Sequence, residues 1–276
     1  MLSIALNIKE KAIILDSENN PKLNLSSQKL YLPVLNIKRN TLQYRIEVKY
    51  AFEKFGIDEK DFWYISDEYL TEEKLFQYST NIKFIVKNVK SNIILVDFNL
   101  LNEKQKYLSD YIINIYDHHI ITNYNNNYPN LKSFNIQIPI GSCSTIILFE
   151  FFMDNFPSKL ISPILALTAN IIDTRNFSKD YYGNRWVDLD LKVFNKIKSE
   201  IKEEINFDEY YKEINGIKHD VEKNIKLGLD TLFTKVQKFY NFNGIKIIWS
   251  AFYISFYEIQ KKIGDEEIIK QMLKSY

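Results

Sequence analysis

Short apolar runs alternate with longer segments of helical periodicity over the first two thirds of the chain. Runs rich in Ile and Val, typical of buried strands, cover residues 81–88, 92–99 and 111–119. Apolar residues recur at helical spacing within residues 41–57, 143–156 and 160–172. Strands that alternate with helices predict an α/β domain with a mainly parallel sheet.

The pattern changes from about residue 196 to long, charged amphipathic helices, followed by a pair of short strands within residues 234–242 and 244–252. This change predicts a second, smaller α+β domain. We therefore expect a first domain at residues 1–195 and a second at residues 205–276.

Composition narrows the function classes. The chain has 276 residues, 46% of them hydrophobic, which is enough for a sizeable core. Its 36 basic and 35 acidic residues give a net charge of +1, which does not favour nucleic acid or an anionic membrane. The single cysteine excludes an internal disulfide framework. Without a secretory signal or a long apolar segment, the sequence predicts a cytoplasmic protein.

Acidic residues end two of the predicted strands. Asp97 follows the run IILV, and Asp117 follows INIY. Ligands collect at the carboxyl ends of parallel strands, so these two carboxylates are expected in one crevice. In the alternative interpretation each aspartate only caps a helix or begins a turn.

Histidines strengthen the functional interpretation. His118 and His119 directly follow Asp117, so that one imidazole can bind a metal while the other faces a substrate. Asp173 ends a predicted helix, where negative charge is unfavourable unless a cation lies nearby. Oxygen and nitrogen ligands without thiolate suit Mn²⁺ or Mg²⁺, which predicts a metal-assisted hydrolase.

The motif GSCST, residues 141–145, stands between a predicted strand and a predicted helix. Gly141 permits close backbone approach, while Ser142, Ser144 or Thr145 can cap the helix whose free N–H groups hold an anion. Many helices begin in this way without a ligand. Beside the Asp-His-His triplet, however, the motif predicts a phosphate site.

These motifs together resemble a known family. LVDFN, Asp-His-His, GSCST and IIDTRNF occur in the order of the DHH phosphoesterases, and residues 32–48 also resemble a segment of that family. The resemblance is greatest to the exopolyphosphatase and prune-like branch, which is related to the manganese-dependent family II inorganic pyrophosphatases. It implies a DHH domain followed by a second DHH-associated domain that covers the substrate.

The resemblance also implies roles for individual residues. Asp97, His118 and Asp173 would bind metal, while Asp117 and His119 would be catalytic. The substrate phosphates would contact these side chains: His119, Ser142, Ser144, Arg175, Arg185 and Lys238. The implied reaction is the hydrolysis of inorganic polyphosphate or pyrophosphate, with two Mn²⁺ or Mg²⁺ ions that activate a water molecule.

The chain departs from the family pattern at both ends. We do not find the Asn-x-Asp-x-Asp motif that supplies several metal ligands, and residues 1–11 resemble the helix that follows it. The final strands and the terminal basic motif of the second domain are also missing. The chain is then either an incomplete active enzyme or a divergent member that has lost catalysis and binds one ion or none.

Two other functions remain open. A non-catalytic, prune-like binding protein would keep the fold to recognise a partner or a polyanion. A DHH-type nuclease ranks third, because the sequence has no Gly-Gly pair for a glycine-rich substrate loop and no strong basic stripe.

Overall fold

A computed structural model describes residues 34–37, 39–59, 62–65, 76–77, 83–84, 92–101, 103–120, 128–154, 162–242 and 244–274. The chain forms two compact units. The first comprises Met1–Arg39 and Lys54–Asn206, and the second comprises Asn40–Glu53 and Phe207–Tyr276. Residues 40–53 were expected in the first domain, but in the structure they cluster with the second unit.

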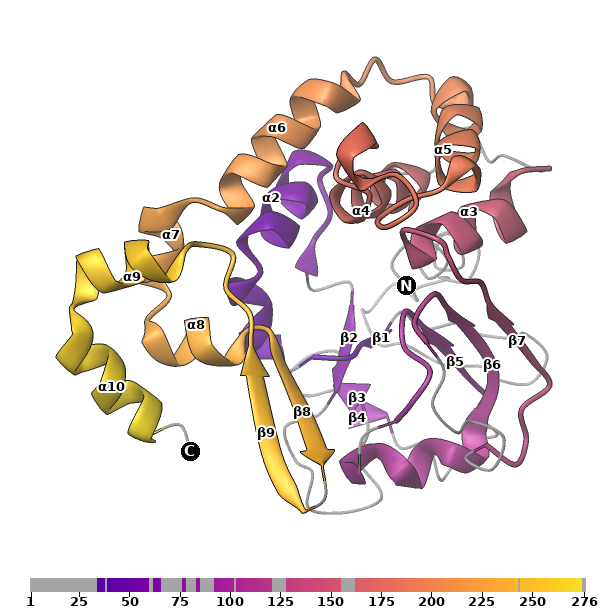
Figure 1. The fold of residues 1–276 in the computed structure, drawn as a ribbon. Helices are drawn as coiled ribbons and strands as arrows, with labels where there is room; N and C mark the ends of the chain where they lie inside the picture. Colours follow the sequence, from indigo (N-terminus) through magenta and orange to yellow (C-terminus); the bar gives the residue numbers. More distant parts are fainter. Residues whose placement is uncertain are drawn as a thin grey trace, which may run out of the picture. The chain divides into compact units, whose positions relative to one another are not determined.

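The first unit contains a parallel sheet of three strands (Figure 1). Its order is β5 (Ile93–Val96), β6 (Ile112–Asp117) and β7 (Ser133–Ile136), and both pairings are parallel. Val96 lies opposite Tyr116, so β5 and β6 end side by side. The predicted α/β class is confirmed, and the residues that follow these two strands share one edge of the sheet.

Helices α3 (Cys143–Phe152), α4 (Ser162–Asp173) and α5 (Asp188–Glu200) pack against one another, and α3 also packs against β6. Their facing side chains are fully buried, as shown by Leu148, Leu167 and Val193. Each such apolar side chain contributes roughly 1.5–3 kcal/mol of burial free energy. Two 3-10 segments complete this region, η4 (Glu103–Tyr111) and η5 (Lys179–Tyr181).

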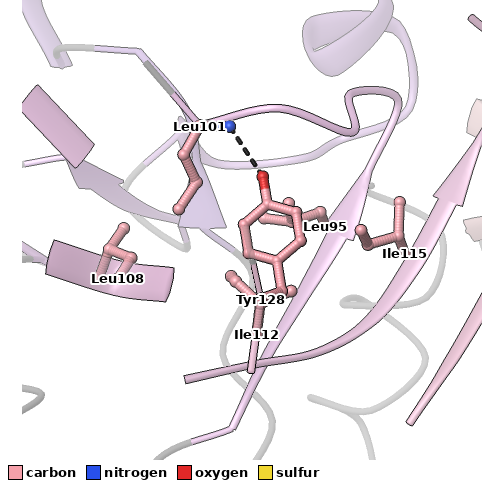
Figure 2. Packing of buried hydrophobic residues seen from close by; sticks show 6 residues of the cluster. All are labelled: Leu95, Leu101, Leu108, Ile112, Ile115 and Tyr128. Atoms are coloured by element: carbon pink, nitrogen blue, oxygen red, sulfur yellow. Dashed lines mark hydrogen bonds between the residues drawn. The ribbon is translucent and has the colours of Figure 1, made fainter. Parts of the chain in front are cut away.

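The hydrophobic cluster drawn in Figure 2 lies beside the parallel sheet. It consists of these buried residues: Leu95, Leu101, Leu108, Ile112, Ile115 and Tyr128. The Tyr128 hydroxyl accepts a hydrogen bond from the Leu101 N–H at 2.9 Å and donates one to the Asn99 carbonyl at 3.0 Å. The core thereby holds the loop that follows β5.

A second sheet has four short strands: β1 (Val34–Leu35), β2 (Trp63–Ile65), β3 (Phe76–Gln77) and β4 (Lys83–Phe84). β1 and β2 are parallel, whereas the other pairings are antiparallel. The apolar run 81–88 was expected in the parallel sheet, but its strand, β4, pairs antiparallel with β3. An apolar run indicates a strand without specifying the neighbour it pairs with.

The second unit is mainly helical. Its elements are η1 (Arg39–Tyr44), α2 (Ile46–Lys54), α6 (Phe207–Lys218), α7 (Val221–Lys226), α8 (Leu229–Thr234), β8 (Gln237–Phe242), β9 (Ile245–Ser250), α9 (Phe256–Ile263) and α10 (Asp265–Lys274). Strands β8 and β9 were expected as a pair, and in the structure they are antiparallel. A core of Leu232, Phe233, Ile254, Ile259 and Ile268 joins the helices. Within the described part of the chain, every helix is too short or too polar to span a bilayer.

Candidate metal centre

Asp97 follows β5 in a left-handed backbone conformation with φ 69°. This conformation costs about 1–2 kcal/mol for a residue other than glycine, although aspartate tolerates it better than most. The Asp97 N–H donates to the Tyr116 carbonyl at 2.9 Å, which extends the parallel ladder by one residue. The mostly exposed Asp97 side chain has its Oδ1 atom 3.4 Å from Nε2 of His118.

His118 has one ring nitrogen anchored to the backbone. Nδ1 lies 2.9 Å from the Ile140 carbonyl oxygen, which can only accept, so Nδ1 carries the proton and donates. In the neutral ring the lone pair is therefore on Nε2, on the side of Asp97. Metal-binding histidines commonly have such an outer hydrogen bond.

The pKa of His118 is strongly perturbed. Burial acts to lower it, but the hydrogen bond and charge of Asp97, the Ile140 carbonyl and the charge of Asp173 raise the pKa of His118 to about 9. The two carboxylates thus create a negative potential at Nε2. In the metal-free protein a proton occupies this position, and a divalent cation would replace it.

Asp117, at the end of β6, is fully buried and orients its neighbours. Its carboxylate accepts hydrogen bonds from Nδ2 of Asn99 at 2.6 Å, Nδ1 of His119 at 2.7 Å and the His118 N–H at 2.8 Å. Burial acts to raise the pKa of Asp117, yet the hydrogen bonds from His119 and from the His118 N–H bring it below its ordinary value. Because Nδ1 of His119 is bound, Nε2 is the nitrogen left to meet a ligand.

Asp97, His118 and His119 form a compact group. One ligand atom from each lies within 4.8 Å of the others, as expected of residues able to bind a metal ion. The two imidazole rings stand edge to face, with centroids 4.5 Å apart. The expected ligand set named Asp173 in place of His119, and His119 was expected at the substrate.

Asp173 is the last residue of α4, and its carboxylate contributes to the potential at His118. Oδ2 of Asp173 accepts a hydrogen bond from the Ser142 hydroxyl at 2.7 Å. The next turn is left-handed, with φ of 56°, 50° and 57° at Arg175, Asn176 and Phe177. The Asn176 N–H donates to the Ile171 carbonyl at 2.7 Å, which closes the helix end directly after Asp173.

Ser142 is the N-cap of α3 and is almost fully buried. Since its hydroxyl proton is donated to Asp173, the Ser144 hydroxyl, 2.8 Å away, donates to Ser142. Ser142 therefore orients a candidate ligand, and its predicted phosphate contact stays a prediction. Burial raises the pKa of the adjacent Cys143 thiol to about 12, so thiolate chemistry is excluded at neutral pH.

The basic residues predicted to bind phosphate belong to different segments of the chain. Arg175 lies in the turn after Asp173 and is half-buried, while the Arg185 side chain is exposed. Lys238 belongs to β8 in the second unit, opposite Trp249, and its side chain lies outside the described residues. Substrate contacts by these three residues stay predictions.

Sequence reasoning missed two residues that organise the centre. Asn99 holds Asp117 and follows Asp97 by two positions in the same loop, a spacing that could have indicated it. Asp190, fully buried in the first turn of α5, accepts from the Gly141 N–H at 3.0 Å. An acid in the first turn of a helix is so common that the sequence carries no signal for this contact.

The donor set fits a hard divalent cation. Asp173 contributes its charge at His118, but its place among the ligands stays a prediction. Asp97 offers a carboxylate oxygen, and His118 and His119 offer ring nitrogens. Such mixed oxygen and nitrogen ligands suit Mn²⁺ or Mg²⁺ better than a structural zinc ion. We conclude that these residues can hold a cation at the carboxyl edge of the sheet.

Comparison with known proteins identifies a similar fold. No family model matches the chain. A crystal structure of a Methanococcus jannaschii protein, described as a candidate family II inorganic pyrophosphatase, has a TM-score of 0.56 and 24% sequence identity to this chain. The match covers 83% of this chain and 67% of that protein. The likeness confirms the α/β fold. Membership of the DHH phosphoesterases, and of their exopolyphosphatase and prune-like branch, stays a prediction.

Proposed function

We propose that this protein is a divalent-metal-dependent hydrolase of phosphoanhydride bonds, acting on inorganic pyrophosphate or short inorganic polyphosphate. One observation carries the proposal. Nε2 of His118 lies 3.4 Å from Oδ1 of Asp97, and the negative charge of Asp173 also acts on the His118 ring. These groups lie at the carboxyl edge of a parallel sheet, where ligands commonly bind. The similar fold of the Methanococcus jannaschii protein supports it.

In this proposal Asp97, His118 and Asp173 hold Mn²⁺ or Mg²⁺. When bound, the cation would act as a Lewis acid, which neutralises the negative charge of phosphate oxygens and increases the acidity of water. Asp117 keeps His119 in one orientation through the 2.7 Å hydrogen bond to Nδ1. In its doubly protonated form His119 also donates from Nε2 to a phosphate oxygen.

Phosphate recognition involves further groups of this chain. The N-terminal N–H groups of α3 favour an anion. The Ser144 hydroxyl would give up its hydrogen bond to Ser142 to donate to that anion. Arg175, Arg185 and Lys238 are the cationic candidates, because guanidinium and ammonium groups are the usual partners of phosphate. A cytoplasmic location would suit a metabolite substrate of this kind.

Phosphate release tests the proposal. Purified protein with Mn²⁺ should release phosphate from pyrophosphate or triphosphate, and His118→Ala should reduce the rate roughly 100-fold or more, because a direct ligand is lost. Asp180→Asn, a change at an exposed acid in η5, should leave the rate unchanged. Absence of release despite bound Mn²⁺ would refute the proposal. Comparing pyrophosphate with longer chains separates a pyrophosphatase from an exopolyphosphatase.

A non-catalytic binding protein is the second candidate function. Within the described part of the chain a single group of potential metal ligands is found, formed by Asp97, His118 and His119. In this alternative one cation or a polyanion binds without turnover. Calorimetric titration with Mn²⁺ distinguishes the two functions: binding without phosphate release favours the binding protein.

A further inference from the structure

The loop from Ile140 to Ser142 touches two of the candidate ligands. The Ile140 carbonyl accepts the hydrogen bond from Nδ1 of His118 at 2.9 Å. The Ser142 hydroxyl donates to Oδ2 of Asp173 at 2.7 Å. The position of this loop therefore sets both the direction of the His118 ring and that of the Asp173 carboxylate.

Asp190 anchors the middle of the loop. Its Oδ2 atom accepts from the Gly141 N–H at 3.0 Å and from the Val187 N–H at 2.9 Å. Its Oδ1 atom accepts from the hydroxyl of Thr145, in the first turn of α3. A buried carboxylate is costly unless it is paired or hydrogen-bonded, and three donors compensate Asp190.

The direction of the Thr145 hydrogen bond is fixed by Asn170. Nδ2 of Asn170, on α4, donates to Oγ1 of Thr145 at 2.7 Å. The Thr145 hydroxyl accepts this bond and gives its own proton to Asp190. All three side chains are fully buried, so they form a connected polar network between α3, α4 and α5.

Close packing restricts the loop from the other side. A Cβ atom at position 141 would lie 2.1 Å from the Arg185 carbonyl oxygen and 3.0 Å from the Thr174 side chain. Gly141 is thus held between Asp190 and this backbone. The loop has little room to shift while these contacts last.

We propose that Asp190 is a positioning residue of the metal centre: by holding Gly141 and Thr145, it fixes the loop that orients His118 and Asp173. Asp190 itself is not a ligand. The expected effect of Asp190 on cation binding rests on the proposed function. Its effect on the orientation of His118 does not, because that orientation is a property of the metal-free protein.

Proton exchange in the metal-free, ¹⁵N-labelled protein tests this role. The chain has only three histidines, which makes the His118 Nδ1–H signal assignable. In Asp190→Asn the His118 Nδ1–H should exchange with water on the order of tenfold faster than in wild type. The Kd for Mn²⁺ should rise by a similar factor, because residues that support metal ligands commonly have effects of this size. Val193→Ala, a buried change on the same helix, should lower stability and leave both values unchanged.

The outcomes separate the two proposals. Unchanged exchange in Asp190→Asn, or equal acceleration in Val193→Ala, overturns the role of Asp190. Faster exchange in a protein that binds no Mn²⁺ upholds that role and refutes the proposed function. If Asp190→Asn does not fold, Thr145→Val is the second test: it should accelerate exchange of the His118 Nδ1–H, and Thr145→Ser should return the rate to that of wild type. Exchange as slow as in wild type in Thr145→Val overturns the inference.

Discussion

Nε2 of His118 lies 3.4 Å from Oδ1 of Asp97, although the two residues follow different strands. The parallel pairing of β5 and β6 brings them together, and the Ile140 carbonyl directs the ring. This ion pair controls the charge at the centre before any cation binds.

The titration of His118 should report this pair. Burial acts to lower its pKa, but Asp97, the Ile140 carbonyl and Asp173 raise it to about 9. In NMR titrations of the metal-free protein, His118 should titrate near 9, and Asp97→Asn should move its pKa toward the ordinary value. A wild-type pKa near 6.5, the ordinary value, would contradict the geometry.

The same shift predicts how stability depends on pH. Because folding raises the pKa of His118, protonated His118 stabilises the folded state. This contribution is fully present below the unfolded pKa of about 6.5. This contribution disappears as the pH rises through about 9. The difference in unfolding free energy between wild type and Asp97→Asn should therefore be larger at about pH 6 than at about pH 10, as measured by denaturant titration. A difference that does not change with pH would exclude the ion pair.

Asp117→Asn should destabilise the protein by about 1–3 kcal/mol, because a buried amide cannot accept all of the hydrogen bonds that the carboxylate does. Since the pKa of Asp117 is lowered on folding, its contribution is present above the ordinary pKa and disappears as the pH falls through the folded value. The variant should therefore lose less stability than wild type on acidification. Asp110→Asn, at an exposed position, is the control and should change stability by less than about 0.5 kcal/mol.

Gly141→Ala should lower the unfolding free energy by about 1–3 kcal/mol, since its Cβ would meet the Arg185 carbonyl at 2.1 Å. Gly216→Ala makes a matched comparison. No atom lies within 4 Å of the added Cβ there, and position 216 is in the last turn of α6. That variant should gain up to about 1 kcal/mol from helix propensity. Equal effects of the two substitutions in thermal unfolding would show that the loop accommodates a side chain.

Tyr128→Phe removes the hydroxyl that joins the Leu101 N–H and the Asn99 carbonyl (Figure 2). Two buried backbone groups then lose a partner, which should cost about 1–3 kcal/mol. Because the Asn99 side chain holds Asp117, the change should also weaken Mn²⁺ binding slightly. Calorimetry and chemical denaturation measure both effects. A neutral result would mean that water replaces the hydroxyl.

Glu47→Gln tests the second unit. Lys235 Nζ and Glu47 Oε2 are 3.8 Å apart, with side chains 4% and 7% exposed. Burial already lowers the pKa of Lys235, and loss of Glu47 leaves its ammonium group without the opposing charge, at a cost of about 3–5 kcal/mol. Glu222→Gln breaks the exposed ion pair with Lys262 and should cost at most about 1 kcal/mol. Similar losses in the two variants would indicate that Lys235 is hydrated.

The sequence alone determined several elements and placed two aspartates at the ends of predicted strands. Apolar periodicity is a local property, and it correctly predicted β5, β6, α3 and α4. Because parallel strands align their carboxyl ends, the aspartates after two such runs could be expected at one edge. The structure places Asp97 and Asp117 there.

Only the tertiary structure decided the partners of each side chain. Ser142 donates to Asp173, and Asp190 holds Gly141, across segments that periodicity treats as independent. Packing between elements also decides that β4 pairs antiparallel with β3. It likewise decides that residues 40–53 belong to the second unit. Such contacts depend on how whole elements pack, since a hydrogen bond forms wherever folding brings donor and acceptor within about 3 Å, whatever their separation along the chain.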